Sequence, residues 1–220
     1  MDHDRRIDHL VSRDRELASL VERFGRPAPF RRPPGFATLV LVILEQQVSL
    51  GSAAAAFHRL SDATEVTPSG LDTLDDDQLR AIGFSRQKIR YVRGLAAAVR
   101  EGRLGLDDLV DLTDDEVRAR LTAVTGIGPW TADVYLLAVL DRPDVWPVTD
   151  RALQLGTREA LDLPDVPDQA GLAQIGDRWR PQRSTAARLI WHGYLAARGR
   201  SAPPVWIPPP VKGRRGSRLP

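Results

Sequence analysis

The chain has 220 residues, of which 42% are hydrophobic and 27% charged, so it is long enough to bury one substantial core or two small lobes that share a cleft. It contains no cysteine, which excludes disulfides, thiolate zinc sites and iron-sulfur clusters. The formal net charge is only +2, so bulk charge does not indicate a nucleic-acid partner.

The chain carries no sign of a membrane segment. Its apolar runs are far shorter than the roughly 20 residues that span a bilayer. The first ten residues, MDHDRRIDHL, are charged and lack the apolar stretch of a secretory signal. We therefore expect a cytoplasmic protein with no membrane partner.

Apolar residues recur at helical spacing along the chain, and no alternating run bounded by hairpin turns indicates a strand. The spacing predicts an all-α fold. The expected helices cover residues 15–24, 36–60, 75–82, 86–101, 114–124, 129–140, 151–161, 169–178 and 184–197.

Capping signals mark several helix ends. Thr113 with Glu116 three residues later forms a capping-box pattern, and Thr73 with Asp76 gives a weaker signal of the same kind. Gly83 stands where a left-handed C-cap would end a helix.

We expect residues 1–200 to form a single unit of two interleaved helical lobes. The remaining segment, residues 201–220, is basic and rich in Pro and Gly. Such a segment has little apolar surface to bury, so we expect it to be disordered.

A Gly-Ile-Gly turn joins two apolar helical segments in LTAVTGIGPWTADVYLLAVL, residues 121–140. The two glycines permit a tight turn and a close backbone approach. The amides of Gly126 and Gly128 can point outward together as an anion-binding nest, for which a phosphodiester is a natural occupant. A plain helix corner without a ligand is the alternative for Gly-x-Gly taken alone.

Residues 124–132, VTGIGPWTA, resemble the helix-hairpin-helix motif of base-excision DNA glycosylases, with Thr125 where that family often has proline. The resemblance implies that the amides of Gly126 and Gly128, with Thr131, bind DNA. It further implies a structural Na⁺ or K⁺ at the hairpin when DNA is bound. Its ligands would be the main-chain carbonyls of Thr122, Val124 and Ile127.

An aspartate follows the hairpin at the interval that this family uses. Asp150 lies twenty residues after Trp130, in the segment VWPVTDRALQLG. Breaking an N-glycosidic bond builds positive charge on the deoxyribose, so a nearby carboxylate stabilises the oxocarbenium-like transition state. The resemblance gives Asp150 this role. Asp150 or Thr149 can also simply cap the helix that begins near Arg151, and the two roles are compatible.

Trp130 occupies the hairpin position at which bifunctional glycosylase-lyases carry a Schiff-base lysine. A lyase needs an amine nucleophile, and the nearest lysine in the sequence is Lys88. We therefore expect release of the base by water, with the abasic strand left uncut. Trp130 suits the stacking of a cationic alkylated purine. Similarity to the alkylpurine branch of the family assigns Trp191 to the same pocket, with core packing as the alternative. Tyr135 is a further candidate for this pocket, although core packing is the favoured interpretation for it.

Residues 36–60 resemble the Ile-Leu-x-Gln-Gln-x-Ser helix of the same family. A flipped base leaves a hole in the duplex, which a wedge side chain fills. Gln46, Gln47 and Leu50 are the candidate wedge residues, and Ser49 is a further candidate DNA contact.

Taken together, these motifs resemble the DNA-3-methyladenine glycosylase II branch of the helix-hairpin-helix superfamily. The implied function is monofunctional hydrolysis of the N-glycosidic bond of alkylated purines, such as 3-methyladenine and 7-methylguanine, in double-stranded DNA. We expect a monomer that needs no cofactor for catalysis, works on the bacterial nucleoid and binds DNA less tightly as salt rises. The alternatives are a glycosylase for hypoxanthine, uracil or oxidised guanine, a non-catalytic DNA-binding hairpin protein, and an all-α interaction protein without DNA affinity.

Overall fold

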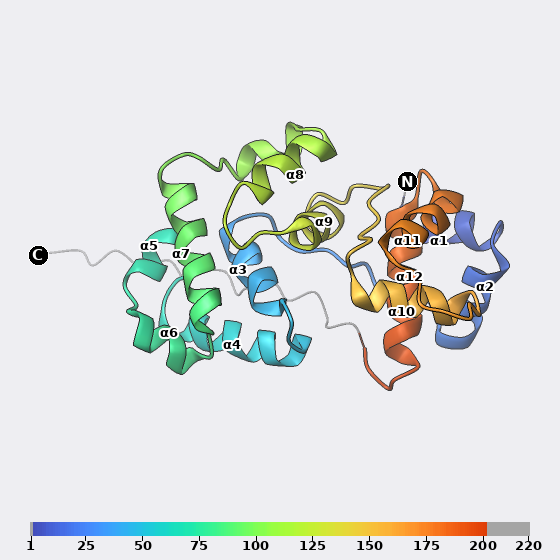
Figure 1. The fold of residues 1–220 in the computed structure, drawn as a ribbon, viewed down its shortest axis with the longest axis horizontal. Helices are drawn as coiled ribbons and strands as arrows, with labels where there is room; N and C mark the ends of the chain where they lie inside the picture. The colour runs from blue at the N-terminus through green and yellow to red at the C-terminus, as the bar shows by residue number, and fades with distance from the viewer. Residues whose placement is uncertain (1, 202–220) are drawn as a thin grey trace, which may run out of the picture.

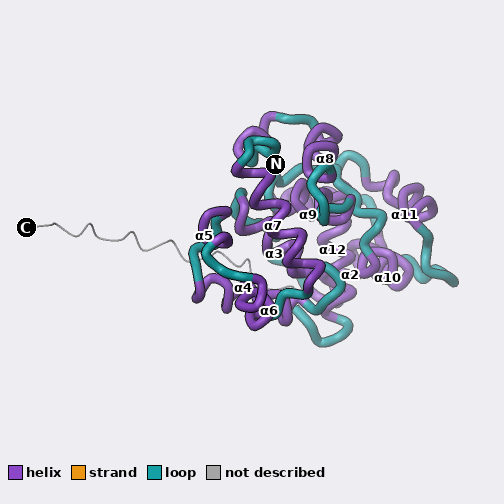
Figure 2. The backbone as a smooth tube through the Cα atoms, turned by 60° about the vertical axis from the view of Figure 1, so that its left-hand side comes forward, coloured by secondary structure: helices purple, strands orange, loops and turns teal. Residues whose placement is uncertain are grey.

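The computed structural model describes residues 2–201, and all regular secondary structure in this part of the chain is helical, as predicted (Figure 2). The helices form two lobes that lie side by side (Figure 1). None of the described helices is both long enough and apolar enough to cross a membrane. All but the first residue of the predicted disordered tail, 201–220, lie outside the described residues.

The central lobe is a single run of chain. Its helices are α3 (Phe36–Glu45), α4 (Leu50–Ala63), α5 (Pro68–Asp72), α6 (Asp76–Ile82), α7 (Arg86–Arg100), α8 (Asp114–Thr122) and α9 (Pro129–Ala138), with a 3₁₀ turn at Asp107–Asp111. Helix α3 packs against α4, α7 and α9. It is apolar on nearly every side, which makes it the centre of this lobe's core.

The terminal lobe joins the two ends of the described chain. It contains α1 (His3–Val11), α2 (Arg15–Phe24), α10 (Arg151–Ala160), α11 (Gln169–Gly176) and α12 (Arg183–Ala196), with a 3₁₀ turn at Asp177–Trp179. Helix α12 packs against both α2 and α10. The two lobes are therefore interleaved in sequence, because the chain leaves the terminal lobe after α2 and returns to it before α10 (Figure 1).

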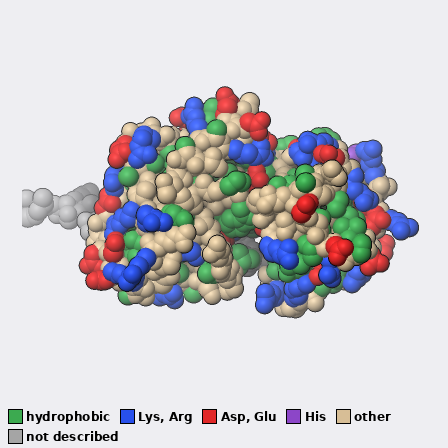
Figure 3. Space-filling model, in the orientation of Figure 1, with side chains coloured by type: hydrophobic (Ala, Val, Ile, Leu, Met, Phe, Trp, Pro, Cys, Tyr) green, Lys and Arg blue, Asp and Glu red, His purple; other side chains and the backbone are tan. Residues whose placement is uncertain are grey.

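Residues 25–35, here called the strap, carry the chain from α2 to α3, and residues 139–150 carry it back from α9 to α10. Between the two lobes the surface is hollowed, and hydrophobic side chains are visible inside the hollow (Figure 3). The fold thus provides an interlobe cleft crossed by two connecting segments.

The single helix predicted over residues 36–60 is wrong, because the chain breaks between α3 and α4. Gln47 has a left-handed backbone with φ 59°, and Ser49 begins a new helix by accepting a hydrogen bond from the amide of Ser52 at 3.1 Å. A left-handed residue cannot continue a right-handed helix. Apolar residues keep a helical spacing on both sides of the break, so the sequence pattern does not indicate the turn.

Three short elements escaped the sequence analysis: α1, α5 and the 3₁₀ turn at Asp107–Asp111. Helix α1 is mostly charged, and only Ile7 and Leu10 on one face are buried. Two apolar residues are too few to give a helical period.

The capping predictions were mostly confirmed. Thr113 and Glu116 form the predicted capping box, and Gly83 ends α6 with φ 115°. The weaker cap signal at Thr73 with Asp76 was wrong, because Asp75 with Gln78 makes the capping box at the start of α6.

Candidate active site

Asp150 accepts three N–H hydrogen bonds from three different places in the fold. The indole Nε1–H of Trp130 donates to its Oδ2 at 2.6 Å, and that of Trp191 donates to its Oδ1 at 3.0 Å. The backbone amide of Leu153 donates to Oδ1 at 2.6 Å. Two carboxylate oxygens that receive three donors act only as acceptors, which is the pattern of an ionised group.

Local structure explains each partner of this cluster. Asp150 is the N-cap of α10, so its carboxylate meets the positive end of that helix. Trp130 stands in the first turn of α9, directly after Pro129, which is well suited to a helix start. Trp191 lies on α12 of the terminal lobe. Asp150 and both indoles are half-buried, so the cluster is partly open to solvent.

Asp150 caps α10, as one interpretation of the sequence predicted, and it also lies at the centre of a polar cluster, while its catalytic role stays a prediction. The predicted meeting of Trp130, Trp191 and Asp150 is present in the structure. The indole N–H of Trp191 reaches Asp150, which core packing alone does not require.

Phe30 contacts the cluster around Asp150 through Trp191, and the sequence analysis missed it. Its ring lies edge-on to that of Trp191, with 6.5 Å between the ring centroids and 66° between the ring planes. It is half-buried and belongs to the strap. The strap has no helical period, so nothing in the local sequence distinguishes Phe30 from an ordinary loop residue.

The structure corrects the assignment of Tyr135 to the base pocket, because this residue is 0% exposed and cannot contact a base. It lies on α9, which is buried from Thr131 to Ala138 and so points side chains into the core in every direction. Burial raises the pKa of the Tyr135 phenol. This residue supports the core behind the hairpin helix rather than the pocket.

The Gly-Ile-Gly turn has two different glycines. Gly126 has φ 95°, and a Cβ placed on it would lie 2.1 Å from Cγ of Tyr91, so the ring of Tyr91 covers this glycine. Gly128 has an ordinary extended backbone, and a Cβ there would meet nothing within 4 Å. Neither amide has a hydrogen-bond partner among the described residues. Both are therefore free to bind an anion.

Gln46 fastens the turn between α3 and α4 to this hairpin. Its Nε2 donates to the Gly126 carbonyl at 2.9 Å and to Oγ1 of Thr131 at 3.1 Å. The prediction that Thr131 contacts DNA is therefore corrected for its side chain, which is 1% exposed and faces Gln46. Gln46 is equally ill-suited to be a wedge, since its amide is already engaged.

The remaining wedge candidates lie at the tip of this turn. Gln47 is exposed and left-handed, whereas Ser49 caps α4 and Leu50 is the first residue of that helix. Val48, which the sequence analysis did not name, is 45% exposed and is one of two exposed large hydrophobic residues in the described chain. The tip therefore presents Gln47 and Val48.

The proposed cation ligands form a set of neutral oxygens. The Val124 carbonyl accepts the amide of Ile127 at 3.0 Å, which leaves one of its two lone pairs for an ion. No group of three or more His, Cys, Asp or Glu side chains suited to a metal exists among the described residues. Carbonyls without carboxylates suit a weakly charged, hard cation better than a divalent metal.

Lys88, one of the two lysines of the chain, lies on α7, and its ammonium group is bonded to α3. Its Nζ donates to the carbonyl of Leu44, in the last turn of α3, at 2.6 Å. Burial lowers the pKa of this ammonium group. The contact ties Lys88 to α3, and among the described residues Lys88 makes no bond to Asp150 or to the two indoles.

Comparison with known proteins finds a consistent set of similarities. Residues 40–181 match the model of the HhH-GPD superfamily base excision DNA repair protein. The chain is 29% identical over 191 residues to the DNA-3-methyladenine glycosylase 1 of Schizosaccharomyces pombe, an alignment that covers 83% of this chain and 84% of the relative. It is 35% identical over 170 residues to an endonuclease III of Sulfolobus acidocaldarius, covering 75% of this chain and 72% of that protein.

Among solved structures, the chain is similar to the 3-methyladenine DNA glycosylase of S. pombe in complex with abasic DNA. The TM-score is 0.78 at 28% identity, and the match covers 85% of this chain and 95% of the solved one. The two-lobed helical architecture is therefore shared with a glycosylase along nearly its whole length.

Proposed function

The chain belongs to the HhH-GPD superfamily of base excision DNA repair proteins, and we propose that it is a DNA-3-methyladenine glycosylase that hydrolyses the N-glycosidic bond of alkylated purines in double-stranded DNA. The single observation that carries the proposal is the cluster at Asp150, where two indoles, one from each lobe, and a helix amide hold one half-buried carboxylate.

The carboxylate of Asp150 supplies the electrostatics of the reaction. As the bond between sugar and base lengthens, positive charge grows on the deoxyribose, and a fixed negative group nearby stabilises that charge. The three donors keep the carboxylate in one orientation, so it needs no reorganisation during the reaction. The base leaves with the electrons of the broken bond, water adds to C1′ of the deoxyribose, and the proton that the added water loses passes to solvent.

The aromatic residues of the cluster favour a cationic base. Trp130 and Trp191 both bond Asp150, and Phe30 lies against Trp191, so three aromatic rings lie near the carboxylate. The π-face of an aromatic ring attracts a positively charged ring. Methylation of a purine ring nitrogen creates this charge. Alkylated purines are therefore a better match than neutral lesions such as hypoxanthine or uracil.

Release by water, without strand cleavage, is supported by the position of lysine. The relatives include an endonuclease III, but this chain has Trp130 at the hairpin position where a lyase needs an amine. Lys88 is bonded to the Leu44 carbonyl. Borohydride should therefore trap no covalent protein–DNA complex, and a trapped complex that disappears in Lys88→Met would overturn this part of the proposal.

DNA binding is proposed to use the hairpin and the turn between α3 and α4. The free amides of Gly126 and Gly128 are suited to one phosphate, and Gln47 with Val48 is suited to fill the gap left by a flipped base. A Na⁺ or K⁺ on the carbonyls of the hairpin would add positive charge beside the same phosphate. Replacing these ions with tetramethylammonium at constant ionic strength should then weaken DNA binding.

The test of the function is base release from a duplex that carries 7-methylguanine or 3-methyladenine. Asp150→Asn should lower the single-turnover rate by at least about a hundredfold, as the loss of a main electrostatic stabiliser does. Asn is as good an N-cap as Asp, so the fold should persist.

Asp168→Asn is the matched control. Asp168 caps α11 by accepting the Gly171 amide at 2.7 Å, as Asp150 caps α10, but it lies outside the cluster. It should retain the wild-type rate. If the wild type binds the duplex and releases only hypoxanthine, uracil or oxidised guanine, the substrate class is wrong; if it releases none of these bases, the chain is a DNA-binding protein without catalysis.

A further inference from the structure

One arginine of the strap connects the two ends of the proposed site. Arg32 donates two hydrogen bonds to the carboxylate of Glu45, at 2.8 and 2.6 Å. Both side chains are nearly inaccessible, at 7% and 6% exposure. Glu45 is the last residue of α3 and directly precedes Gln46 and Gln47, so this ion pair lies at the base of the turn proposed as the wedge.

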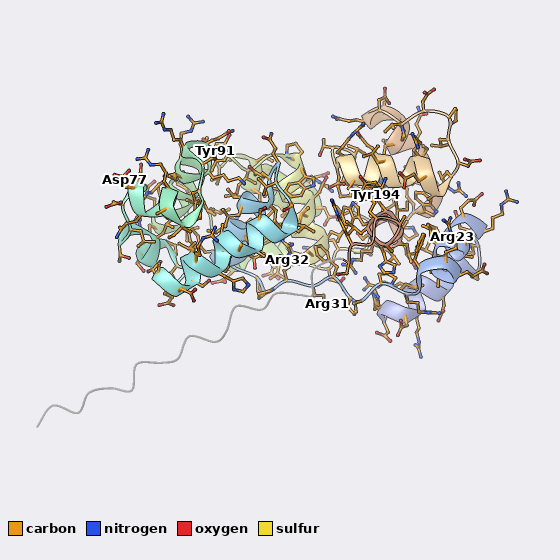
Figure 4. All side chains as sticks on the ribbon, turned by 90° about the horizontal axis from the view of Figure 1, so that it is seen from below. Arg23, Arg31, Arg32, Asp77, Tyr91 and Tyr194 are labelled. Atoms are coloured by element: carbon orange, nitrogen blue, oxygen red, sulfur yellow. The ribbon has the colours of Figure 1, made fainter. Side chains whose placement is uncertain are left out.

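The same arginine also faces the pocket. Its guanidinium carbon lies 5.1 Å from the centroid of the Phe30 ring, and Phe30 in turn contacts Trp191, which donates to Asp150. The backbone amide of Arg32 donates to the carbonyl of Ala138, at the end of α9, at 2.8 Å. Figure 4 shows Arg31 and Arg32 on the strap where it passes between the two lobes.

We infer that Arg32 is a positioning residue that couples the turn at residues 46–49 to the aromatic pocket around Asp150. Every link is a direct contact. Glu45 holds the guanidinium, the guanidinium lies over Phe30, Phe30 packs on Trp191, and Trp191 holds the carboxylate. The role rests on the proposed function, because that function defines both the wedge and the pocket.

The position of Glu45 at the end of a helix and its burial both require a positively charged partner. An acidic side chain at the C-terminal end of a helix faces the negative end of the helix dipole. A buried carboxylate also needs a charged partner that satisfies both of its oxygens. Arg32 meets both needs, and its planar fork fixes where its guanidinium lies relative to Phe30. Any displacement of the turn when a wedge enters DNA therefore reaches Phe30 through one rigid group.

A role of this ion pair in stability alone would have a different consequence for base release. If Arg32 and Glu45 only stabilised the fold, disturbing the pair would lower the release of every base by the same factor. If they position Phe30, the loss should fall mainly on the base whose positive charge the aromatic pocket recognises.

The test compares single-turnover release of cationic 7-methylguanine with that of neutral hypoxanthine. Glu45→Gln touches neither Phe30 nor Trp191, yet we expect it to lower release of 7-methylguanine about tenfold and that of hypoxanthine about twofold, the scale expected for weakening a desolvated cation–π contact. Arg32→Lys keeps the charge but loses the planar fork, and should change the same ratio in the same direction.

Asp144→Asn is the matched control, because the Asp144 carboxylate also accepts two hydrogen bonds from one guanidinium, that of Arg183, at 2.9 Å for each bond, and is not a member of the Arg32–Phe30–Trp191 chain of contacts. It should leave the ratio of the two rates unchanged. Equal loss for both bases in Glu45→Gln, or a ratio shift in Asp144→Asn of the same size, would overturn the inference.

A second measurement separates this inference from the proposed function. In the free protein the indole N–H signal of Trp191, assigned with Trp191→Phe, should shift in ¹⁵N-resolved NMR spectra of both Glu45→Gln and Arg32→Lys. It should stay in place in Asp144→Asn. If the wild type releases no base but the Trp191 signal shifts as expected, the proposed function fails and the coupling stands. An unmoved signal overturns the coupling whatever the activity.

Discussion

The indole of Trp130 donates its N–H to Oδ2 of Asp150 at 2.6 Å, across twenty residues of sequence. The contact joins the first turn of α9 to the N-cap of α10. It means that the residue standing where a lyase carries its lysine is also the residue that orients the candidate catalytic carboxylate. The residue proposed to stack the base and the residue proposed to stabilise the sugar charge are thus one hydrogen-bonded unit.

Removing an indole donor should slow base release directly, and not through a loss of stability. Trp130→Phe and Trp191→Phe keep an aromatic ring but leave Asp150 with one donor fewer. A hydrogen bond to a charged group contributes roughly 1.5–3 kcal/mol, so we expect each variant to lose about tenfold or more in single-turnover rate.

Trp179→Phe is the control for these two variants. The Trp179 indole donates to Oδ2 of Asp14 at 2.8 Å, a bond of the same kind in the terminal lobe away from the cluster. This variant should be less stable to urea but should release the base at the wild-type rate once folded. A rate loss equal to that of Trp130→Phe would mean that the indole bonds at Asp150 act only through stability.

Substituting the two hairpin glycines should affect different properties, namely stability for Gly126 and duplex affinity for Gly128. Gly126→Ala forces a side chain into a positive-φ position and against the Tyr91 ring, so the free energy of unfolding should fall by more than about 1 kcal/mol. Gly128→Ala meets no neighbour, so its stability should stay within about 1 kcal/mol of wild type. Its methyl group would nevertheless stand where a phosphate approaches the amide, and duplex affinity should fall about tenfold.

Urea unfolding and fluorescence anisotropy with a labelled duplex separate the two effects. Wild-type affinity in Gly128→Ala would remove its amide from the proposed phosphate site.

Gln47→Gly tests the wedge without harming the fold. Glycine accepts the left-handed backbone at φ 59° better than glutamine does, so the variant should be at least as stable as wild type. It lacks the side chain proposed to fill the gap in the duplex. Flipping, followed by the fluorescence of 2-aminopurine beside the lesion, should therefore weaken.

Val48→Ala is measured alongside Gln47→Gly. If Val48→Ala loses flipping and Gln47→Gly does not, the wedge is the exposed valine.

The stability of the chain at alkaline pH should depend on Lys88. Burial holds the pKa of the Lys88 ammonium below the ordinary lysine value of 10.5. Between the two values the unfolded chain binds more protons at this position than the folded chain, so the folded state gains stability as pH rises through that window. Lys88→Met lacks this gain.

The difference in free energy of unfolding between wild type and Lys88→Met should therefore move in favour of the wild type from neutral pH to roughly pH 10. Urea titrations at the two pH values measure it. A constant difference would show that Lys88 is no harder to charge in the fold than in the unfolded chain.

Local signals in the sequence predicted most of the helices and their caps. The capping box at Thr113 with Glu116 and the C-cap at Gly83 formed as predicted, because each depends on residues within one turn of helix. The break at Gln47 escaped prediction because the apolar residues on both sides keep a helical period. Only the tertiary bonds of Gln46 to the hairpin reveal that the chain must turn there.

The sequence by itself determined the all-α class, the Gly-Ile-Gly hairpin, the candidate aspartate and the absence of a hairpin lysine. These features are readable because residue type, helical period and spacing act over a few residues. Only the tertiary structure decided that Tyr135 and the Thr131 side chain are buried, that Phe30 joins Trp191, and that one arginine links the turn to the pocket. The physical reason is that side chains meet across helices from distant parts of the chain, such as Trp191 and Asp150 forty-one residues apart. Such meetings depend on how whole helices pack and not on any local pattern.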